Sequence, residues 1–239
     1  MIQSIVSALI PISEDIRILR LQPSVPYHYE AGQYAELTFE GFDPRPFSIA
    51  NAPGATYLEF HIRGVGQGAR AYAARELRVG DTVMISPSMG QCTYVAGCSK
   101  PILAIAGGIG LAPIKALLEE AIHHGHEAPI YLYFGGRIES DLYMRDDIAT
   151  LGAAHHDFTL VMALSAEKNS QYRSGMIADV VLEDFDDLNP FRIYIGGPPA
   201  MIEASVPGLL AAGADLSCIH SDTTITMTRP ETNSARERG

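Results

Sequence analysis

The first hundred residues alternate apolar and polar positions in short runs that Pro and Gly separate. This alternation is typical of strands with one buried face, and strands that follow each other so closely favour an antiparallel barrel. The runs that predict strands are Val6–Ile10, Ile16–Leu21, Tyr34–Phe39, Tyr57–Arg63 and Thr82–Ser86. We therefore predict an N-terminal antiparallel β-barrel.

The pattern changes from Pro101 onward. An apolar run, Ile102–Ala106, meets a Gly-rich turn, and apolar residues then recur at helical spacing as far as Ile122. The same strand-and-helix pattern returns as Ile130–Phe134 with Leu142–Leu151, Phe158–Leu164 with Met176–Leu182, and Arg192–Ile195 with Ala200–Ala211. Strands that alternate with helices predict a C-terminal α/β domain with a doubly wound parallel sheet.

The two patterns meet around Val95–Lys100, which sets the expected domain boundary. We expect the barrel to comprise residues 1–97 and the α/β domain to comprise residues 98–225. Residues 226–239 are polar and lack an apolar period, so we expect a disordered tail there.

Composition narrows the classes of function. A formal net charge of −11 opposes binding to a phosphate backbone, so nucleic acid is not an expected partner. No apolar run approaches the roughly 20 residues that cross a bilayer, and Met1–Pro11 lacks the features of a secretory leader, so we expect a cytoplasmic protein with no membrane partner. Cys92, Cys98 and Cys218 are too few and too scattered for a disulfide framework or an iron–sulfur cluster, which favours ordinary thiols in a reducing compartment.

A Gly-rich segment opens the first helix of the α/β half. Gly107-Gly108-Ile109-Gly110 directly follows a buried strand, so its backbone N–H groups and the helix dipole can face a pyrophosphate. The spacing departs from the GxGxxG fingerprint of dinucleotide-binding folds. A plain strand-to-helix turn is therefore an open alternative for this segment.

A second motif lies in the barrel half. Arg45-Pro46-Phe47-Ser48 places a cation, an aromatic ring and a hydroxyl within four residues of extended chain. Strand alternation puts Arg45 and Phe47 on one face and Ser48 on the other, unless the strand bends there. An ordinary strand with Phe47 in the barrel core is the alternative.

Together the two halves, from Ser4 to Asp222, resemble the ferredoxin:NADP reductase superfamily, especially flavin reductases and the reductase components of bacterial aromatic-ring oxygenases. The resemblance implies a bound FAD, with FMN as the alternative. It implies that Arg45 binds the flavin phosphate, that Phe47 lies against the isoalloxazine and that the Ser48 hydroxyl lies near N5. It also assigns to the flavin site Pro46 of the same motif and six residues of the next strand and its phosphate loop: His61, Ile62, Arg63, Gly68, Ala69 and Arg70.

The resemblance also implies a nicotinamide site in the α/β half. It assigns the pyrophosphate to Gly107, Gly108 and Gly110, the adenosine ribose to Gly135 and Arg137, and the nicotinamide to Gly197, Pro198 and Met201. Gly196 stands where the family carries a cysteine, and we expect it to act with Ser48 in catalysis by leaving room for the nicotinamide ring.

The choice of nicotinamide stays open at this stage. Arg137 could meet the 2′-phosphate of NADPH, whereas Glu139 or Asp141 could accept from the free 2′-hydroxyl of NADH. Two carboxylates beside one cation favour NADH.

The predicted function is a flavin-dependent NAD(P)H oxidoreductase that passes a hydride to its flavin and electrons to a separate acceptor, which is a ferredoxin, an oxygenase component or free flavin. The alternative is a degenerate family member that acts as a redox-sensing or regulatory protein. Three departures from the family pattern support that alternative: Gly196, the loop at Arg70, and Thr224. At the position of Thr224 the family usually has an aromatic residue. No metal site is predicted, because the His-rich and acidic segments lack the spacing of ligands.

Overall fold

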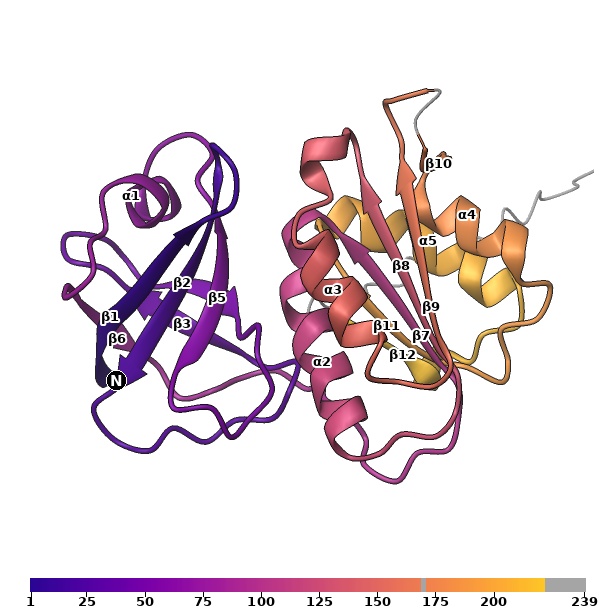
Figure 1. Ribbon diagram of the computed structural model, residues 1–239, viewed down its shortest axis with the longest axis horizontal. Coiled ribbons are helices and arrows are strands. Elements are labelled where there is room, and N and C mark those ends of the chain that lie inside the picture. The colour runs from indigo at the N-terminus through magenta and orange to yellow at the C-terminus, as the bar shows by residue number, and fades with distance from the viewer. Residues whose placement is uncertain (169–170, 222–239) are drawn as a thin grey trace, which may run out of the picture.

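The computed structural model describes residues 1–168 and 171–221. It contains two six-stranded sheets that lie side by side, the first in the N-terminal half and the second in the C-terminal half (Figure 1). The elements of the first half are β1 (Ile2–Pro11), β2 (Ile16–Pro23), β3 (Tyr34–Thr38), β4 (Arg45–Ser48), β5 (Leu58–Arg63), α1 (Ala69–Arg75) and β6 (Thr82–Ile85).

The first sheet is antiparallel throughout, with strand order β4-β3-β6-β1-β2-β5. Its two edges meet just beyond β4, where Ile49 forms an isolated bridge with Phe60 of β5. The N–H of Ala50 also donates to the carbonyl of Glu59 at 2.7 Å. These contacts close the sheet, so the predicted antiparallel barrel is confirmed, and closure leaves few unpaired strand edges.

Strand β5 is the one strand of this sheet whose two faces are both covered along most of its length. Leu58, Phe60 and Ile62 point into the barrel core and are 3% exposed or less. Glu59 and His61, on the opposite face, are also buried. Their burial places polar side chains of the barrel against the second domain.

The second half alternates strands and helices. Its elements are β7 (Ile102–Gly107), η1 (Gly108–Gly110), α2 (Leu111–His123), β8 (Ile130–Gly136), η2 (Glu139–Asp141), α3 (Arg145–Gly152), β9 (Phe158–Leu164), β10 (Arg173–Ser174), α4 (Ile177–Asp184), β11 (Arg192–Gly196), α5 (Pro199–Ala211), η3 (Leu216–Cys218) and β12 (Ile219–Ser221). The strands are parallel, in the order β10-β9-β8-β7-β11-β12. This order confirms the predicted doubly wound parallel sheet.

Helices cover both faces of this sheet (Figure 1). On β7, Ile102, Ala104 and Ala106 face α2 and α3, whereas Leu103 and Ile105 face α4 and α5. Because successive side chains of a strand point to opposite faces, a strand covered on both sides needs an unbroken apolar run. Helix α2 lies on the side of the sheet that faces the barrel.

Strand order reverses between β7 and β11, since the chain adds β8 and β9 on one side of β7 and β11 on the other. Ligands of doubly wound sheets bind at the carboxyl ends of the strands at such a switch point. Here those ends carry the turn Gly107–Gly110 and the turn Gly196–Pro199. The fold thus places both Gly-rich segments at one position.

The element boundaries differ from the sequence-based expectation at one helix. The helix expected over Leu142–Leu151 begins only at Arg145, because Glu139–Asp141 forms a 3₁₀ turn and Met144 has a φ of 56°. The tail 226–239 and Thr224 lie outside the described residues. Within the described part of the chain, no helix is long and apolar enough to cross a membrane.

Candidate active site

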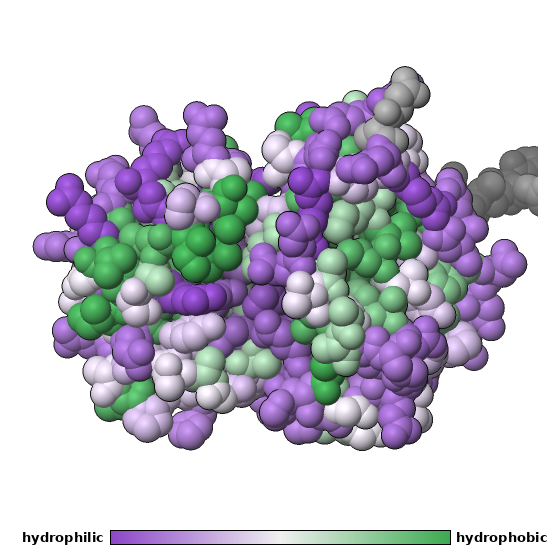
Figure 2. Space-filling model, viewed as in Figure 1, coloured by the Kyte–Doolittle hydropathy of each residue, from purple (hydrophilic) through white to green (hydrophobic). Residues whose placement is uncertain are grey.

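A cleft of about 810 Å³ lies between the barrel and the α/β domain. Space-filling spheres show the two domains in contact, with the surface hollowed between them at the upper edge of the view (Figure 2). The barrel contributes Tyr34, Glu36, Pro46, Phe47, Ser48, His61, Arg63, Val65 and Arg70 to the cleft, and the α/β domain contributes Gly107, Gly108, Ile109, Gly110, Ala112, Gly197, Pro198 and Pro199. Both motifs singled out in the sequence therefore meet in one cleft.

The Arg45–Ser48 motif forms β4, which pairs with β3. The Phe47 ring is 7% exposed and packs edge-on against Phe39 in the barrel core, at 6.1 Å between ring centroids. Phe47 also borders the cleft, together with Ser48. Phe47 is therefore part of the barrel core and also lines the cleft, so both alternatives for this residue hold.

Arg45 points to a second hollow, of about 870 Å³, that shares β4 and the start of α1 with the cleft. The side chains of Phe42 and Tyr72 lie there at 5.0 Å between ring centroids. A guanidinium and two aromatic rings suit the phosphate and the base of a nucleotide, but the same hollow is also lined by three acidic residues, Glu40, Asp43 and Asp81.

The segment Gly66–Arg70 leads into α1. Gly68 has a φ of 94°, a conformation that favours glycine, and it lines the second hollow. Arg70 lies over the Phe47 ring, 5.5 Å from its centroid, and its Nη2 donates to the carbonyl of Pro46 at 3.4 Å. The guanidinium of Arg70 thus lies beside the Phe47 ring at the border of the cleft.

The β5 residues assigned to the flavin do not all reach the cleft. His61 and Arg63 line it, but the Ile62 side chain is fully buried in the barrel core, so only its backbone is available to a ligand. Arg63 is held by two ion pairs, at 3.1 Å to Asp15 and at 2.8 Å to Asp141. These pairs fix the guanidinium at the border between the two domains.

The glycines of the α/β loops allow close backbone approach. A Cβ on Gly110 would lie 2.3 Å from the carbonyl carbon of Gly196 and from the nitrogen of Gly197. A Cβ on Gly107 would lie 2.3 Å from the sulfur of Met201. Met201 is therefore a packing partner of the Gly-rich turn, and the glycines bring the two loops together at the switch point.

Gly196 packs against the backbone of Gly110. It is buried and does not line the cleft, and its missing Cβ points at the carbonyl oxygen of Gly110, at 2.5 Å. A Cβ here would require the backbone of Gly110 to shift. Gly197, the next residue, lines the cleft, and the role expected of Gly196 beside the nicotinamide stays a prediction.

The two carboxylates that follow β8, Glu139 and Asp141, are less available to a ligand than the sequence suggested. Asp141 accepts from the backbone N–H of Arg137 at 2.9 Å and pairs with Arg63. Burial opposes its ionisation, but these donors outweigh that effect and lower the pKa of Asp141. Glu139 pairs with Arg145 at 2.6 Å. Both carboxylates are thus neutralised by arginines, which weakens the argument that they repel a 2′-phosphate, and Arg137 is exposed.

No group of three His, Cys, Asp or Glu side chains that could hold a metal occurs among the described residues. In the His-rich segments, His126 and His155 are buried, and Nε2 of His155 lies 2.7 Å from the carbonyl oxygen of His126. The acidic residues Glu183 and Asp184 pair with Arg173.

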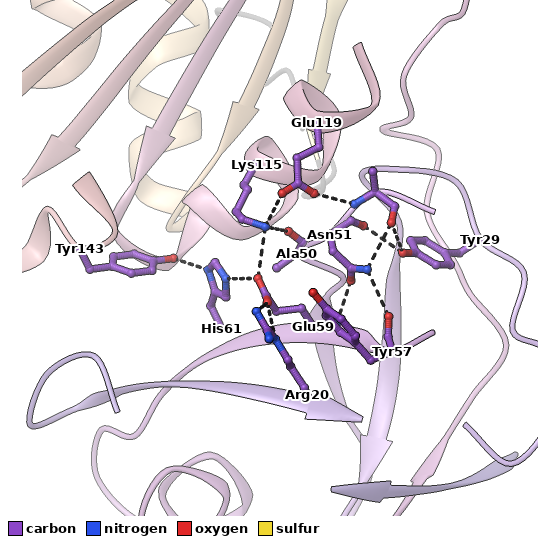
Figure 3. A network of polar contacts seen from close by, with 11 residues as sticks. Arg20, Tyr29, Ala50, Asn51, Tyr57, Glu59, His61, Lys115, Glu119 and Tyr143 are labelled. Carbon is purple, nitrogen blue, oxygen red and sulfur yellow. Dashed lines mark hydrogen bonds and ion pairs between the residues drawn. The ribbon is translucent and has the colours of Figure 1, made fainter. Parts of the chain in front are cut away.

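A buried polar network, which sequence reasoning missed, joins the barrel to the α/β domain beside the cleft (Figure 3). Lys115 on α2 reaches Glu59 on β5 at 3.2 Å, and it also pairs with Glu119 at 2.6 Å. His61 lies between Glu59 and the hydroxyl of Tyr143, at 3.3 Å and 2.7 Å. The local patterns gave no signal of this contact, since Glu59 occupies a polar position of an alternating strand and Lys115 a position within an amphipathic helix.

The network has further arms on the barrel. Arg20 holds the second oxygen of Glu59 through two nitrogens, each at 2.9 Å. Lys115 donates to the carbonyl of Ala50 at 3.0 Å, and Glu119 accepts from the N–H of Ala52 at 2.8 Å. Helix α2 is therefore fixed to the chain that follows β4.

The fold and the cleft define a two-domain oxidoreductase that binds a flavin on its barrel and a nicotinamide cofactor on its α/β domain. Residues 3–94 match the family model of the oxidoreductase FAD-binding domain, and residues 104–206 match that of the oxidoreductase NAD-binding domain. The chain belongs to the ferredoxin:NADP reductase superfamily.

Relatives with curated names support this assignment. The ferredoxin–NAD(P)(+) reductase component of the naphthalene 1,2-dioxygenase system of Pseudomonas putida is 36% identical over 80% of this chain and 59% of the relative. The reductase component of the naphthalene 1,2-dioxygenase/salicylate 5-hydroxylase systems of Ralstonia sp. is 33% identical, over 92% and 68%. A probable flavin reductase of Vibrio harveyi is 29% identical, over 82% and 86%. The chain thus spans less than two thirds of the first of these relatives.

Solved structures agree with the fold. The ferredoxin reductase in carbazole 1,9a-dioxygenase matches with a TM-score of 0.85 and 26% identity, over 92% of this chain and 68% of that one. An Amycolatopsis cytochrome P450 reductase matches with a TM-score of 0.87 and 30% identity, over the same shares of the two chains.

Proposed function

We propose that this protein is an NAD(P)H-dependent flavin oxidoreductase. The observation that carries the proposal is the single cleft in which Phe47 and Ser48 of the barrel face the Gly107–Gly110 turn of the α/β domain. When bound, the flavin supplies the redox chemistry by taking a hydride from the nicotinamide and passing electrons onward. The protein supplies binding, orientation and exclusion of water.

Each part of the two hollows suits one part of the cofactors. Arg45 and Arg70 bind the flavin phosphates, since guanidinium groups match phosphate oxygens in pairs. Phe47 supports the isoalloxazine, and the Ser48 hydroxyl holds the flavin near N5. The N-terminus of α2, behind Gly107–Gly110, favours the negative charge of the nicotinamide cofactor's pyrophosphate.

The remaining assignments concern the nicotinamide cofactor and the limits of each domain. Gly197 and Pro198 form the wall beside the nicotinamide, and Arg137 at the end of β8 lies toward the adenosine. Residues 1–97 and 98–225 form the two binding units, which is supported by a first sheet that ends at Ile85 and a second that begins at Ile102. None of the three cysteines forms a disulfide, which fits a reducing compartment such as the cytoplasm.

We infer that the electron acceptor is a separate molecule. The names of the relatives point to a ferredoxin or an oxygenase component, and that of the Vibrio harveyi relative points to free flavin. Steady-state assays with NADH and each class of acceptor, a [2Fe–2S] ferredoxin against free FMN and FAD, distinguish these possibilities.

The test of the proposed function is an anaerobic titration of the purified protein with NADH and with NADPH. We expect a yellow protein whose released flavin is FAD and whose visible absorbance is bleached by about one equivalent of nicotinamide per flavin. A yellow protein that neither nicotinamide bleaches would instead support a redox-sensing member of the family. A protein that binds no flavin would overturn the assignment of the barrel.

A further inference from the structure

The polar network between the domains contains a set of balanced charges, which we call the interdomain cluster: Arg20, Glu59, Lys115 and Glu119, with His61 at its edge (Figure 3). The side chain of Glu59 is 3% exposed and that of Lys115 is 12% exposed, so their charges are poorly screened by water. Two cations and two carboxylates sum to zero when His61 is uncharged.

The protonation state of His61 depends on these charges, because its ring contacts the Glu59 carboxylate. The side chain of His61 is fully buried, and the residue is among those that line the cleft. The Glu59 carboxylate can only accept, so Nε2 carries the hydrogen and donates to it, and Nδ1 then accepts from the Tyr143 hydroxyl. Both nitrogens are satisfied by the neutral ring, and burial lowers the pKa of His61.

The other charged groups near this site are already compensated. Arg63, the next charged residue along β5, is paired with Asp15 and Asp141. Tyr143 stays protonated, because burial raises its pKa. The proton on His61 therefore depends on the four charges of the interdomain cluster.

We propose that Lys115 is a positioning residue that keeps His61 uncharged at the wall of the flavin cleft. Lys115 and His61 share the same oxygen of Glu59, Oε1, at 3.2 and 3.3 Å, so the ammonium charge of Lys115 satisfies the carboxylate that would otherwise draw a proton onto the imidazole. The significance of this neutral wall rests on the proposed function, because a charge at this place would act on a bound flavin.

Lys115 also couples this electrostatic role to the nicotinamide side. Helix α2 begins at Leu111, directly after the Gly107–Gly110 turn, and Lys115 stands about one turn further along. Its bond to the carbonyl of Ala50 ties that helix to the segment that follows Ser48. The Lys115 side chain thus fixes the helix behind the Gly107–Gly110 turn to the segment after β4, and it also compensates the charge of Glu59.

The direct test is histidine-selective ¹⁵N NMR of the flavin-loaded protein, which reports the tautomer and protonation of His61. In the wild type we expect a neutral Nε2–H ring between about pH 6 and about pH 8, the range in which an ordinary histidine titrates. Lys115→Met removes the charge of the side chain and keeps its approximate length, so the net charge of the interdomain cluster becomes −1. We expect the pKa of His61 to rise by about one unit or more, as is typical beside an uncompensated carboxylate.

Matched variants separate charge from packing. Lys115→Met combined with Glu119→Gln removes one cation and one anion, so we expect the pKa of His61 to rise less than in Lys115→Met alone. Lys115→Arg should leave His61 neutral. Arg20→Gln removes a cation from the opposite, more exposed side and should raise the pKa of His61 by a smaller amount. It serves as the test if Lys115→Met does not fold.

Two results would overturn the proposal: a cationic His61 in the wild type at neutral pH, or an unchanged His61 in both single-cation variants. The midpoint potential of the flavin is the second readout. In Lys115→Met it should become more positive as the pH falls below the new pKa of His61, and the double variant should show less of this extra pH dependence. The NMR titration does not require turnover, so it can succeed even if the proposed oxidoreductase activity fails, and the two failures are distinguishable.

Discussion

The buried carboxylate of Glu59 makes the stability of this protein sensitive to acid. Burial opposes its ionisation, but the bond from His61, the charge of Lys115 and the bond from Arg20 outweigh that effect and lower the pKa of Glu59 from 4.5 to about 2. A group whose pKa is depressed in the folded state stabilises that state above its unfolded pKa. The stabilisation is therefore present above about pH 4.5 and is lost as the pH falls toward about 2.

The difference of about 2.5 pH units, at ~1.36 kcal/mol per unit, corresponds to about 3 kcal/mol of folding free energy. In Glu59→Gln this contribution disappears at neutral pH, where Arg20 and Lys115 lose their shared carboxylate. We expect the free energy of unfolding of the variant to be about 3 kcal/mol lower at pH 7, a loss in the range for breaking buried ion pairs. At low pH, where Glu59 is itself protonated in the wild type, the gap between the two proteins should narrow.

Urea unfolding of both proteins at several pH values between about 7 and about 3 measures this gap. Glu14→Gln, at an exposed position between β1 and β2, is the matched control and should follow the wild type at every pH. If Glu59→Gln and the wild type lose stability in parallel over the whole range, the depressed pKa of Glu59 does not contribute to folding, and the reasoning is refuted.

Four further outcomes are expected. Arg45→Ala should purify with little flavin and Arg45→Lys with an intermediate amount, as measured by absorbance per protein, because a point charge replaces a planar fork; full occupancy in both would remove Arg45 from the phosphate site. Ser48→Ala should keep its flavin and slow its reduction several-fold in stopped flow. Gly110→Ala should lower the melting temperature by several degrees, since the new Cβ meets the backbone of Gly196 and Gly197 at 2.3 Å. NADH and NADPH should differ by about tenfold or less in flavin reduction, because Glu139 and Asp141 are already paired with arginines and a screened surface charge shifts binding by about 1 kcal/mol. Arg137→Ala should weaken NADPH alone.

Sequence patterns predicted the parts of this structure that depend on local order. Alternation along Tyr34–Phe39 and the apolar run Ile102–Ala106 each reflect the burial of one or both faces of a strand, which neighbouring residues reveal. The motif at Arg45–Ser48 and the turn at Gly107–Gly110 could be placed on their strands for the same reason. That both motifs line one cleft followed from the resemblance, and the structure brings them together.

The rest depended on contacts between residues far apart in the chain. Lys115 and Glu59 are 56 positions apart, and nothing in either local pattern indicates that α2 would meet β5. The same reason explains two contacts that the sequence did not indicate: the close approach of Gly196 to the carbonyl of Gly110, and the ion pair of Asp141 with Arg63 from the other domain. Spacing within a motif does not report such partners.

The most direct measurement is a single-turnover reaction of the protein-bound flavin with nicotinamide, in the absence of oxygen, with hydrogen or deuterium at the transferred position of the nicotinamide ring. If Phe47, Ser48 and the Gly107–Gly110 turn form one hydride-transfer site, the flavin band bleaches in a single fast phase that deuterium slows. A flavin that stays oxidised with both NADH and NADPH would contradict this function.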